Sequence, residues 1–167
     1  MHLKLLLISL LIFIACNKGI EPEPESIEVG FSGTITFIGE WDSTITSTNI
    51  VLFRKPILSA ANFSITNINY ASEVIPFGVK TYNFNTTQNS PVLNTIEPGE
   101  YAYLAVAQTR EANIVLTRSA WVVAGIYVPE NDSSKAGRII VSENEFLTNV
   151  NIICDFNNPP PQPPGGI

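Results

Sequence analysis

Apolar and polar residues alternate along most of this chain, and the alternation predicts β-strands rather than helices. In the first such segment, Phe31, Ile35 and Phe37 fall on one face of a strand. In the last such segment, Cys154 and Phe156 share one face with the aliphatic residues at the alternate positions. The pattern predicts seven strands, at residues 31–38, 49–55, 79–84, 100–108, 120–128, 138–141 and 149–156.

Turn-forming residues such as Pro98-Gly99 and Ala136-Gly137 separate these segments. Seven short strands within roughly 127 residues (30–156) predict one all-β domain, a single antiparallel β-sandwich with a core of its own. Residues 57–75 show no clear period, so that a short helical turn and an irregular crossover both fit them. After the domain, residues 157–167 are rich in proline and glycine and are expected to form an extended, disordered tail. Such a tail is either a recognition peptide or simply a solvated end of the chain.

The first residues resemble a secretory signal. Lys4 supplies a short positive region, and about a dozen apolar residues follow, whereas a helix that spans a bilayer needs about 20. Residues 1–15 are therefore predicted to be a signal peptide. The Ala15-Cys16 pair resembles a lipobox, although Phe13 stands where leucine is usual, and it predicts cleavage before Cys16 and lipidation of its thiol. The alternative is an ordinary signal peptide that happens to contain a cysteine.

Residues 16–29 are predicted to be the lipidated cysteine and a flexible spacer, because glutamate and proline alternate from Glu21 to Glu25 and cannot pack. The lipid would supply the membrane affinity of the chain. Asn17 stands where aspartate would favour retention in the inner membrane, and this fits an outer-membrane destination. The sequence thus predicts a lipid-anchored protein of the bacterial cell envelope.

Charge and cysteine content restrict the classes of partner that the chain is expected to bind. Only 14% of residues are charged, and 15 acidic against nine basic residues give a net charge of −6. Without a basic stripe, the chain is a poor candidate for nucleic acid or for anionic lipid headgroups. The expected partners are the membrane, through Cys16, and envelope proteins or glycans. If Cys16 is lipidated, Cys154 has no partner for an internal disulfide.

The segment at residues 95–101, Thr-Ile-Glu-Pro-Gly-Glu-Tyr, resembles the L-x-P-G-x-Y corner of transthyretin-like, carboxypeptidase-regulatory-like domains. The sequence from Gly33 to Phe37 is similar to the first strand of these domains. The resemblance implies a prealbumin-like, Greek-key sandwich that works as a non-catalytic accessory or binding module. In the corner, Gly99 would accept the turn geometry, while the Tyr101 ring would enter the core and its hydroxyl would reach the backbone.

The sequence lacks the residues that most catalytic mechanisms require. The one histidine is His2, which leaves with the signal, and this excludes a Ser-His-Asp triad, a Cys-His pair and a His-ligated zinc site. We expect no enzyme activity, no cofactor and no metal, and we interpret Cys154 as a small core residue. A carboxylate-based hydrolase and a calcium site stay open. Their candidates are Glu40 with Asp42 and Glu143 with Glu145 for hydrolysis, and Glu130, Asn131 and Asp132 for calcium.

The two tryptophans differ in their surroundings. Trp121 begins an apolar segment and is expected in the core, whereas Trp41 lies in a polar stretch beside Asp42. Trp41 is open to two interpretations, packing at the rim of the core or contact with a ligand. In the second, Trp41 and Asp42 would bind a sugar ring or a protein partner, and the chain would be a carbohydrate-binding surface lipoprotein.

Overall fold

The computed structural model of the protein describes residues 28–130 and 135–166, and their regular structure is β-strand apart from short 3-10 turns. The predicted all-β class is confirmed. The signal segment, Cys16 and most of the spacer lie outside the described residues, as do Asn131 and Asp132. The strands are β1 (Gly30–Ile38), β2 (Ser47–Phe53), β3 (Ile68–Ala71), β4 (Thr81–Asn85), β5 (Gly99–Tyr101), β6 (Tyr103–Thr109), β7 (Trp121–Tyr127), β8 (Ile139–Val141), β9 (Phe146–Leu147) and β10 (Ile152–Asp155), and the turns are η1 (Ala60–Asn62) and η2 (Arg118–Ala120).

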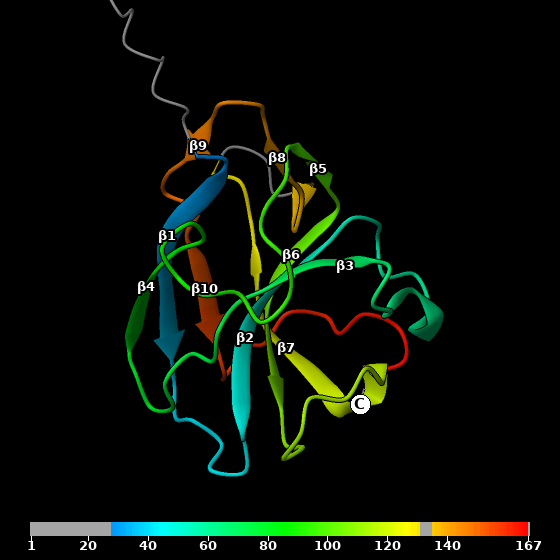
Figure 1. The fold of residues 1–167 in the computed structure, drawn as a ribbon. Coiled ribbons are helices and arrows are strands. Elements are labelled where there is room, and N and C mark those ends of the chain that lie inside the picture. The colour runs from blue at the N-terminus through cyan, green and yellow to red at the C-terminus, as the bar shows by residue number, and fades with distance from the viewer. Residues whose placement is uncertain (1–27, 131–134, 167) are drawn as a thin grey trace, which may run out of the picture.

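Most strands belong to one curled sheet, in the order β3-β2-β6-β7-β10-β1-β4, with β9 also paired to β1 (Figure 1). Strands β5 and β8 form a separate antiparallel pair. The main sheet is mixed, because β1 runs parallel to β10, with Ile35 opposite Ile152, and parallel to β9. The predicted arrangement, with all strands antiparallel, is wrong at this point. Alternation shows which residues face inward, but it carries no information about a strand's neighbour or its direction.

The inward faces are as predicted. Phe31, Ile35 and Phe37 on β1 are buried, and so are Ile152 and Cys154 on β10. Together with residues of β2 and β6 they form an inner core cluster inside the curl of the sheet. Trp121 is also buried, as expected, but it belongs to a second cluster.

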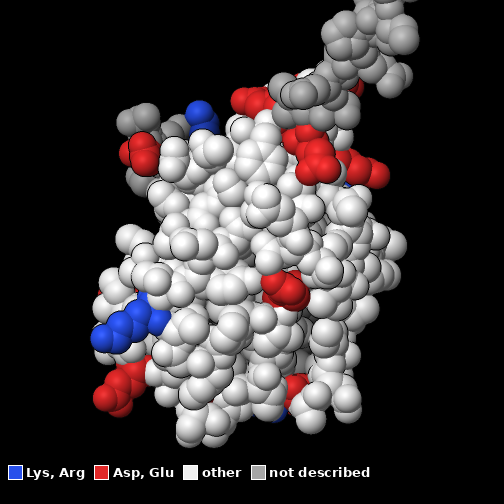
Figure 2. All heavy atoms as spheres, turned by 60° about the vertical axis from the view of Figure 1, so that its left-hand side comes forward, with Lys and Arg blue, Asp and Glu red and all other residues white. Residues whose placement is uncertain are grey.

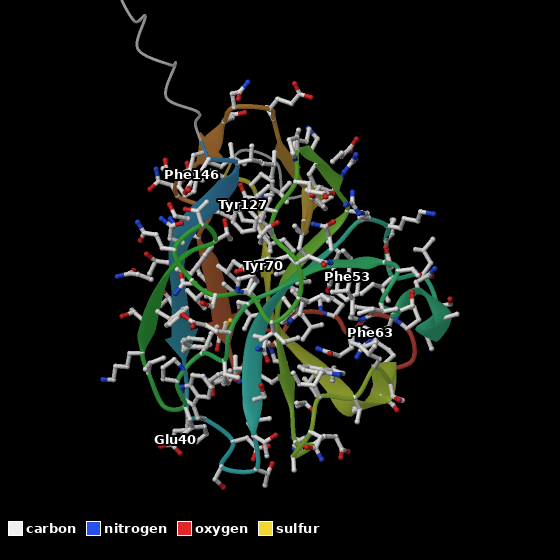
Figure 3. The ribbon with its side chains drawn as sticks, viewed as in Figure 1. Glu40, Phe53, Phe63, Tyr70, Tyr127 and Phe146 are labelled. Carbon is white, nitrogen blue, oxygen red and sulfur yellow. The ribbon has the colours of Figure 1, made fainter. Side chains whose placement is uncertain are left out.

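This second, outer cluster covers the other face of the central strands. Along β2, Ile50 and Leu52 belong to the inner cluster, whereas Val51 and Phe53 belong to the outer one. Phe53 packs against Phe63 from the segment after η1, with 5.6 Å between the ring centroids (Figure 3). Because both faces of β2 and β6 are buried, these strands are continuous apolar runs rather than alternating ones.

The segment predicted as one strand at 100–108 is divided at Ala102. Tyr101, before the break, lies in the inner cluster, while Tyr103, after it, packs against the outer cluster. The Ala102 N–H donates to the Phe53 carbonyl at 3.0 Å, and the chain passes there from the β5–β8 pair into the main sheet. Two tyrosines spaced by two would share a face in an unbroken strand. The break therefore sends them to opposite sides.

The tyrosine corner has the expected geometry in part. The Tyr101 ring is fully buried, and its hydroxyl donates to the Glu97 carbonyl at 2.6 Å and accepts from the Asn69 amide at 3.2 Å. The expectation for Gly99 is wrong, because its φ lies outside the left-handed region and the turn does not require glycine. Asn69 comes from β3, a strand in the segment that the sequence left open between a helical turn and a crossover.

Residues 157–166 follow the surface of the domain, where we expected a disordered tail. The Gln162 side-chain amide accepts from the Val123 N–H at 2.8 Å and donates to the Val123 carbonyl at 2.9 Å. The buried Arg118 side chain donates to the Pro163 carbonyl at 3.0 Å. Strand β10 pairs with β7 only at Ile126 and Tyr127, so the Gln162 amide occupies part of the β7 edge that β10 leaves open. One side chain thus supplies the hydrogen bonds of a neighbouring strand.

Replacing Gln162 with alanine is expected to lower the free energy of unfolding by about 1–2 kcal/mol, because the N–H and carbonyl of the buried Val123 lose their partners. Urea unfolding followed by tryptophan fluorescence measures this change. Gln88→Ala is the matched control, because the Gln88 side chain is exposed and forms no hydrogen bond within the described part of the chain. Equal unfolding midpoints for the two variants would show that the tail does not stabilise the domain.

Candidate functional site

Trp41 lies in an aromatic cluster in the connection from β1 to β2. Its ring centroid is 4.6 Å from that of Phe37 and 5.3 Å from those of Phe77 and Phe156. The indole N–H donates to the Val79 carbonyl at 3.1 Å, so that this donor is used within the domain. Trp41 is partly buried, whereas Phe77 is 56% exposed. The structure therefore assigns Trp41 a packing role, and its contact with a glycan stays a prediction.

Asp42 stabilises the same connection. Its carboxylate accepts from the Thr44 N–H at 2.9 Å and the Thr44 hydroxyl at 2.7 Å, and it pairs with Arg110 at 2.7 Å. The hydrogen bonds from Thr44, followed by those from Arg110, lower the pKa of Asp42 to about 2. An ionised carboxylate with these donors joins the loop to the end of β6 and cannot act as a general acid at neutral pH.

The two pairs of acidic residues lie apart. Glu40 and Asp42 line one small hollow of about 210 Å³ with Arg110, and Trp41 does not line it. Glu143 and Glu145 lie in the connection between β8 and β9, at the opposite end of the domain, where Figure 3 places Phe146 far from Glu40. The four carboxylates therefore form no common site. Of the calcium candidates, Glu130 alone is described, and the other two lie outside the described residues.

Cys154 is fully buried in the inner cluster. Burial raises the pKa of its thiol to about 12, and a protonated, inaccessible thiol is neither a nucleophile nor a metal ligand. This agrees with its interpretation as a small core residue. Among the described residues, no group of three His, Cys, Asp or Glu side chains is placed to hold a metal ion.

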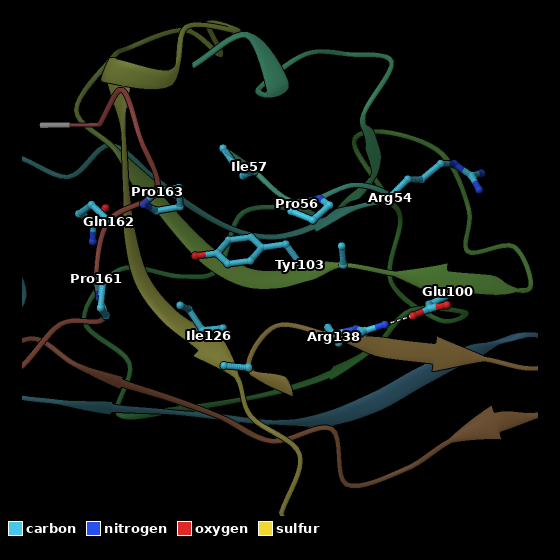
Figure 4. A pocket seen from close by; sticks show the side chains of 12 residues that line it. Arg54, Pro56, Ile57, Glu100, Tyr103, Ile126, Arg138, Pro161, Gln162 and Pro163 are labelled. Atoms are coloured by element: carbon cyan, nitrogen blue, oxygen red, sulfur yellow. Dashed lines mark hydrogen bonds and ion pairs between the residues drawn. The ribbon is translucent and has the colours of Figure 1, made fainter. Parts of the chain in front are cut away.

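One cleft of the described domain has a volume of about 870 Å³ and lies between the start of β6, the β5–β8 pair and the tail (Figure 4). The Arg138–Glu100 ion pair stands at one end, and Pro161 and Pro163 stand at the other. Tyr103 lies along the floor, and its buried hydroxyl has no hydrogen-bond partner among the described residues. Desolvation raises the pKa of Tyr103 to about 12, so the hydroxyl stays a donor at neutral pH.

Sequence reasoning missed this cleft because its walls come from segments far apart in the chain. The visible signals were the charged residues Arg54 and Arg138 beside otherwise apolar strands, and the proline run of the tail. The arrangement can bind a ligand or a peptide by shape and hydrogen bonding. It offers no nucleophile with an adjacent base.

Comparison with known proteins finds no family model, no curated protein and no solved structure that matches this chain. Within residues 28–130 and 135–166, no helix has the length and hydrophobicity needed to cross a membrane.

Proposed function

We propose that this chain is a lipid-anchored, non-catalytic module of the bacterial cell envelope that binds or supports a partner. The observation that carries the proposal is the sequence Ala15-Cys16 at the end of a short apolar leader, followed by a spacer rich in glutamate and proline. Leader, cysteine and spacer precede a β domain that begins at Gly30 and has its own core. A tether that leads into a separately folded domain is the organisation of an anchored module.

The position at which the chain enters the domain supports this proposal. Strand β1 begins beside β9, with Gly30 opposite Phe146, at the end of the domain far from Glu40 (Figure 3). Acidic side chains gather at this end, while the middle of the face in Figure 2 carries little charge. An acidic end is repelled by anionic lipid headgroups. The 13 residues of the spacer reach at most roughly 45 Å when extended, which is enough to separate the domain from the membrane surface.

We also propose that the domain is a variant of the transthyretin-like, Greek-key sandwich and that it sits at the outer membrane. The buried Tyr101 with its hydrogen bond to the Glu97 carbonyl supports the first part. The parallel pairing of β1 with β10 would then be the feature in which this chain differs from an antiparallel sandwich. Asn17 after the cysteine supports the second part.

The anchor is tested by Cys16→Ala in cells given an alkyne-tagged palmitate. We expect the wild-type chain to incorporate the tag and to sediment with membranes, and the variant to lose both properties, because the thiol is the attachment point. Cys154→Ala is the matched control and should keep the tag, since Cys154 is buried in the core. Label and sedimentation that persist in Cys16→Ala would overturn the proposal.

A further inference from the structure

The outer core cluster is incompletely covered on one side. Where the chain segments around η1, β3 and the connection before β7 meet, they leave a pocket of about 230 Å³ against the outer face of the sheet. Its walls include the buried side chains of Val51, Phe63, Ala107 and Trp121. The pocket therefore opens directly onto the hydrophobic core.

Four large aliphatic side chains surround the opening and are about half exposed: Ile65 (51%), Val92 (53%), Ile114 (55%) and Leu116 (49%). They come from three separate connections, after η1, after β4 and after β6. Single exposed aliphatic residues are common on protein surfaces, but a contiguous group that rims a pocket marks a binding site. This convergence is the observation that distinguishes the pocket from the rest of the surface.

The lining restricts the chemistry of a ligand. Among the described residues that line the pocket, Asn49 alone is polar. Its amide donates to the Ser72 carbonyl at 2.9 Å and its oxygen accepts from the Ser47 hydroxyl at 2.7 Å, so both ends already have partners. A polar group brought into the pocket would lose its hydrogen bonds to water without replacement. The part of a ligand that enters must therefore be hydrocarbon.

The volume restricts its size. An apolar cavity of about 150 Å³ holds one benzene molecule, so a pocket of this volume accommodates roughly nine carbon atoms. A linear chain bound end-on would keep its polar end in water beside the exposed rim residues. We infer that this pocket binds the alkyl chain, about nine carbons long, of a small amphiphile.

The test uses Trp121, whose ring lines the pocket, as the reporter. The chain from residue 16 onward is prepared with two substitutions. Cys16→Ala removes the proposed lipidation site, so the protein needs no detergent, and Trp41→Phe leaves Trp121 as the sole tryptophan. The probe is 8-bromooctan-1-ol, because bromine quenches indole fluorescence on contact. We expect saturable quenching of Trp121 as the probe is added.

Two variants and one control locate the binding. Ala71→Leu fills the pocket and should weaken the apparent affinity at least tenfold, and Ile114→Ser removes part of the rim and should weaken it about fivefold. Ile140→Ser, on β8, replaces an isoleucine of similar exposure (63%) outside the pocket and should change nothing. Because Ile114 is exposed, its variant keeps the test valid if Ala71→Leu fails to fold. The inference is overturned by quenching that never saturates, by equal affinity in Ile114→Ser and Ile140→Ser, or by binding of 2-bromonaphthalene in place of the alkyl probe.

Discussion

Replacing Gly33 with alanine is expected to lower the free energy of unfolding by about 3 kcal/mol or more, a large part of what a domain of this size possesses. Gly33 lies on the inward face of β1 between Phe31 and Ile35, where residues 149–151 pass across the strand. A Cβ atom at Gly33 would lie 2.1 Å from the Val150 carbonyl oxygen and 2.5 Å from its carbonyl carbon. Both are backbone atoms, and the Val150 N–H already donates to the Ser32 carbonyl at 3.0 Å, so that this segment cannot move away cheaply.

Urea unfolding of Gly33→Ala beside Gly99→Ala checks this prediction. Gly99 is the matched control because it also lies in a strand, and a Cβ there would be 3.8 Å from its nearest neighbour, the Tyr101 ring. We expect Gly99→Ala to stay within about 0.5 kcal/mol of the wild type. If Gly33→Ala unfolds at the midpoint of Gly99→Ala, the close approach of β1 and Val150 is wrong.

The Cys154 thiol of the folded protein is expected to react with a disulfide reagent at least about a thousandfold more slowly at pH 8 than a cysteine in a peptide. Burial raises its pKa from 9.0 to about 12, so that the reactive thiolate is about a thousand times less populated, and the side chain is inaccessible as well. Cys16→Ala leaves Cys154 as the one cysteine, and absorbance of the released thiol measures its rate.

The same protein in concentrated urea is the control and should react at the rate of the peptide. The pH dependence has a definite sign. The unfolded thiol ionises near pH 9 and the folded one near pH 12, so between these values the unfolded state has fewer bound protons and stability falls as pH rises. Labelling of the native protein should therefore keep rising with pH up to about pH 12, whereas labelling of the unfolded protein should level off above about pH 9. Rapid labelling at pH 8 without urea would contradict the burial of Cys154.

Several features of the fold were predictable because a local pattern determines them. Alternation placed Phe31, Ile35 and Cys154 inside, and a buried Tyr101 followed from the corner that precedes it. Strand β3 was not predicted, because it is only four residues long and lies in a polar stretch that contains Asn67 and Asn69. These asparagines are buried, with Asn69 bonded to the Tyr101 hydroxyl, and such burial depends on partners distant in the sequence.

The sites were less predictable for a related reason. A tryptophan in a polar stretch suggests exposure, but Trp41 packs against Phe77 and Phe156, which lie 36 and 115 residues away in the sequence. The Asp42 carboxylate accepts a hydrogen bond from Thr44, only two residues further on. The sequence Asp42-Ser43-Thr44 alone could have predicted this short-range turn. The apolar pocket forms where three connections that are distant in the sequence come together, and no local pattern predicts this arrangement.

The place of β10 in the sheet has a consequence for the order of assembly. In the main sheet β10 lies between β7 and β1, so the half that contains β1 and β4 joins the half that contains β2, β3, β6 and β7 through this last strand. Because β10 is the last of the described strands in the sequence, a chain that is synthesised from its N-terminus presents it after all the others. Under the proposed export, the two halves of the sheet could not unite until β10 had crossed the membrane, so completion of the domain would wait for this strand.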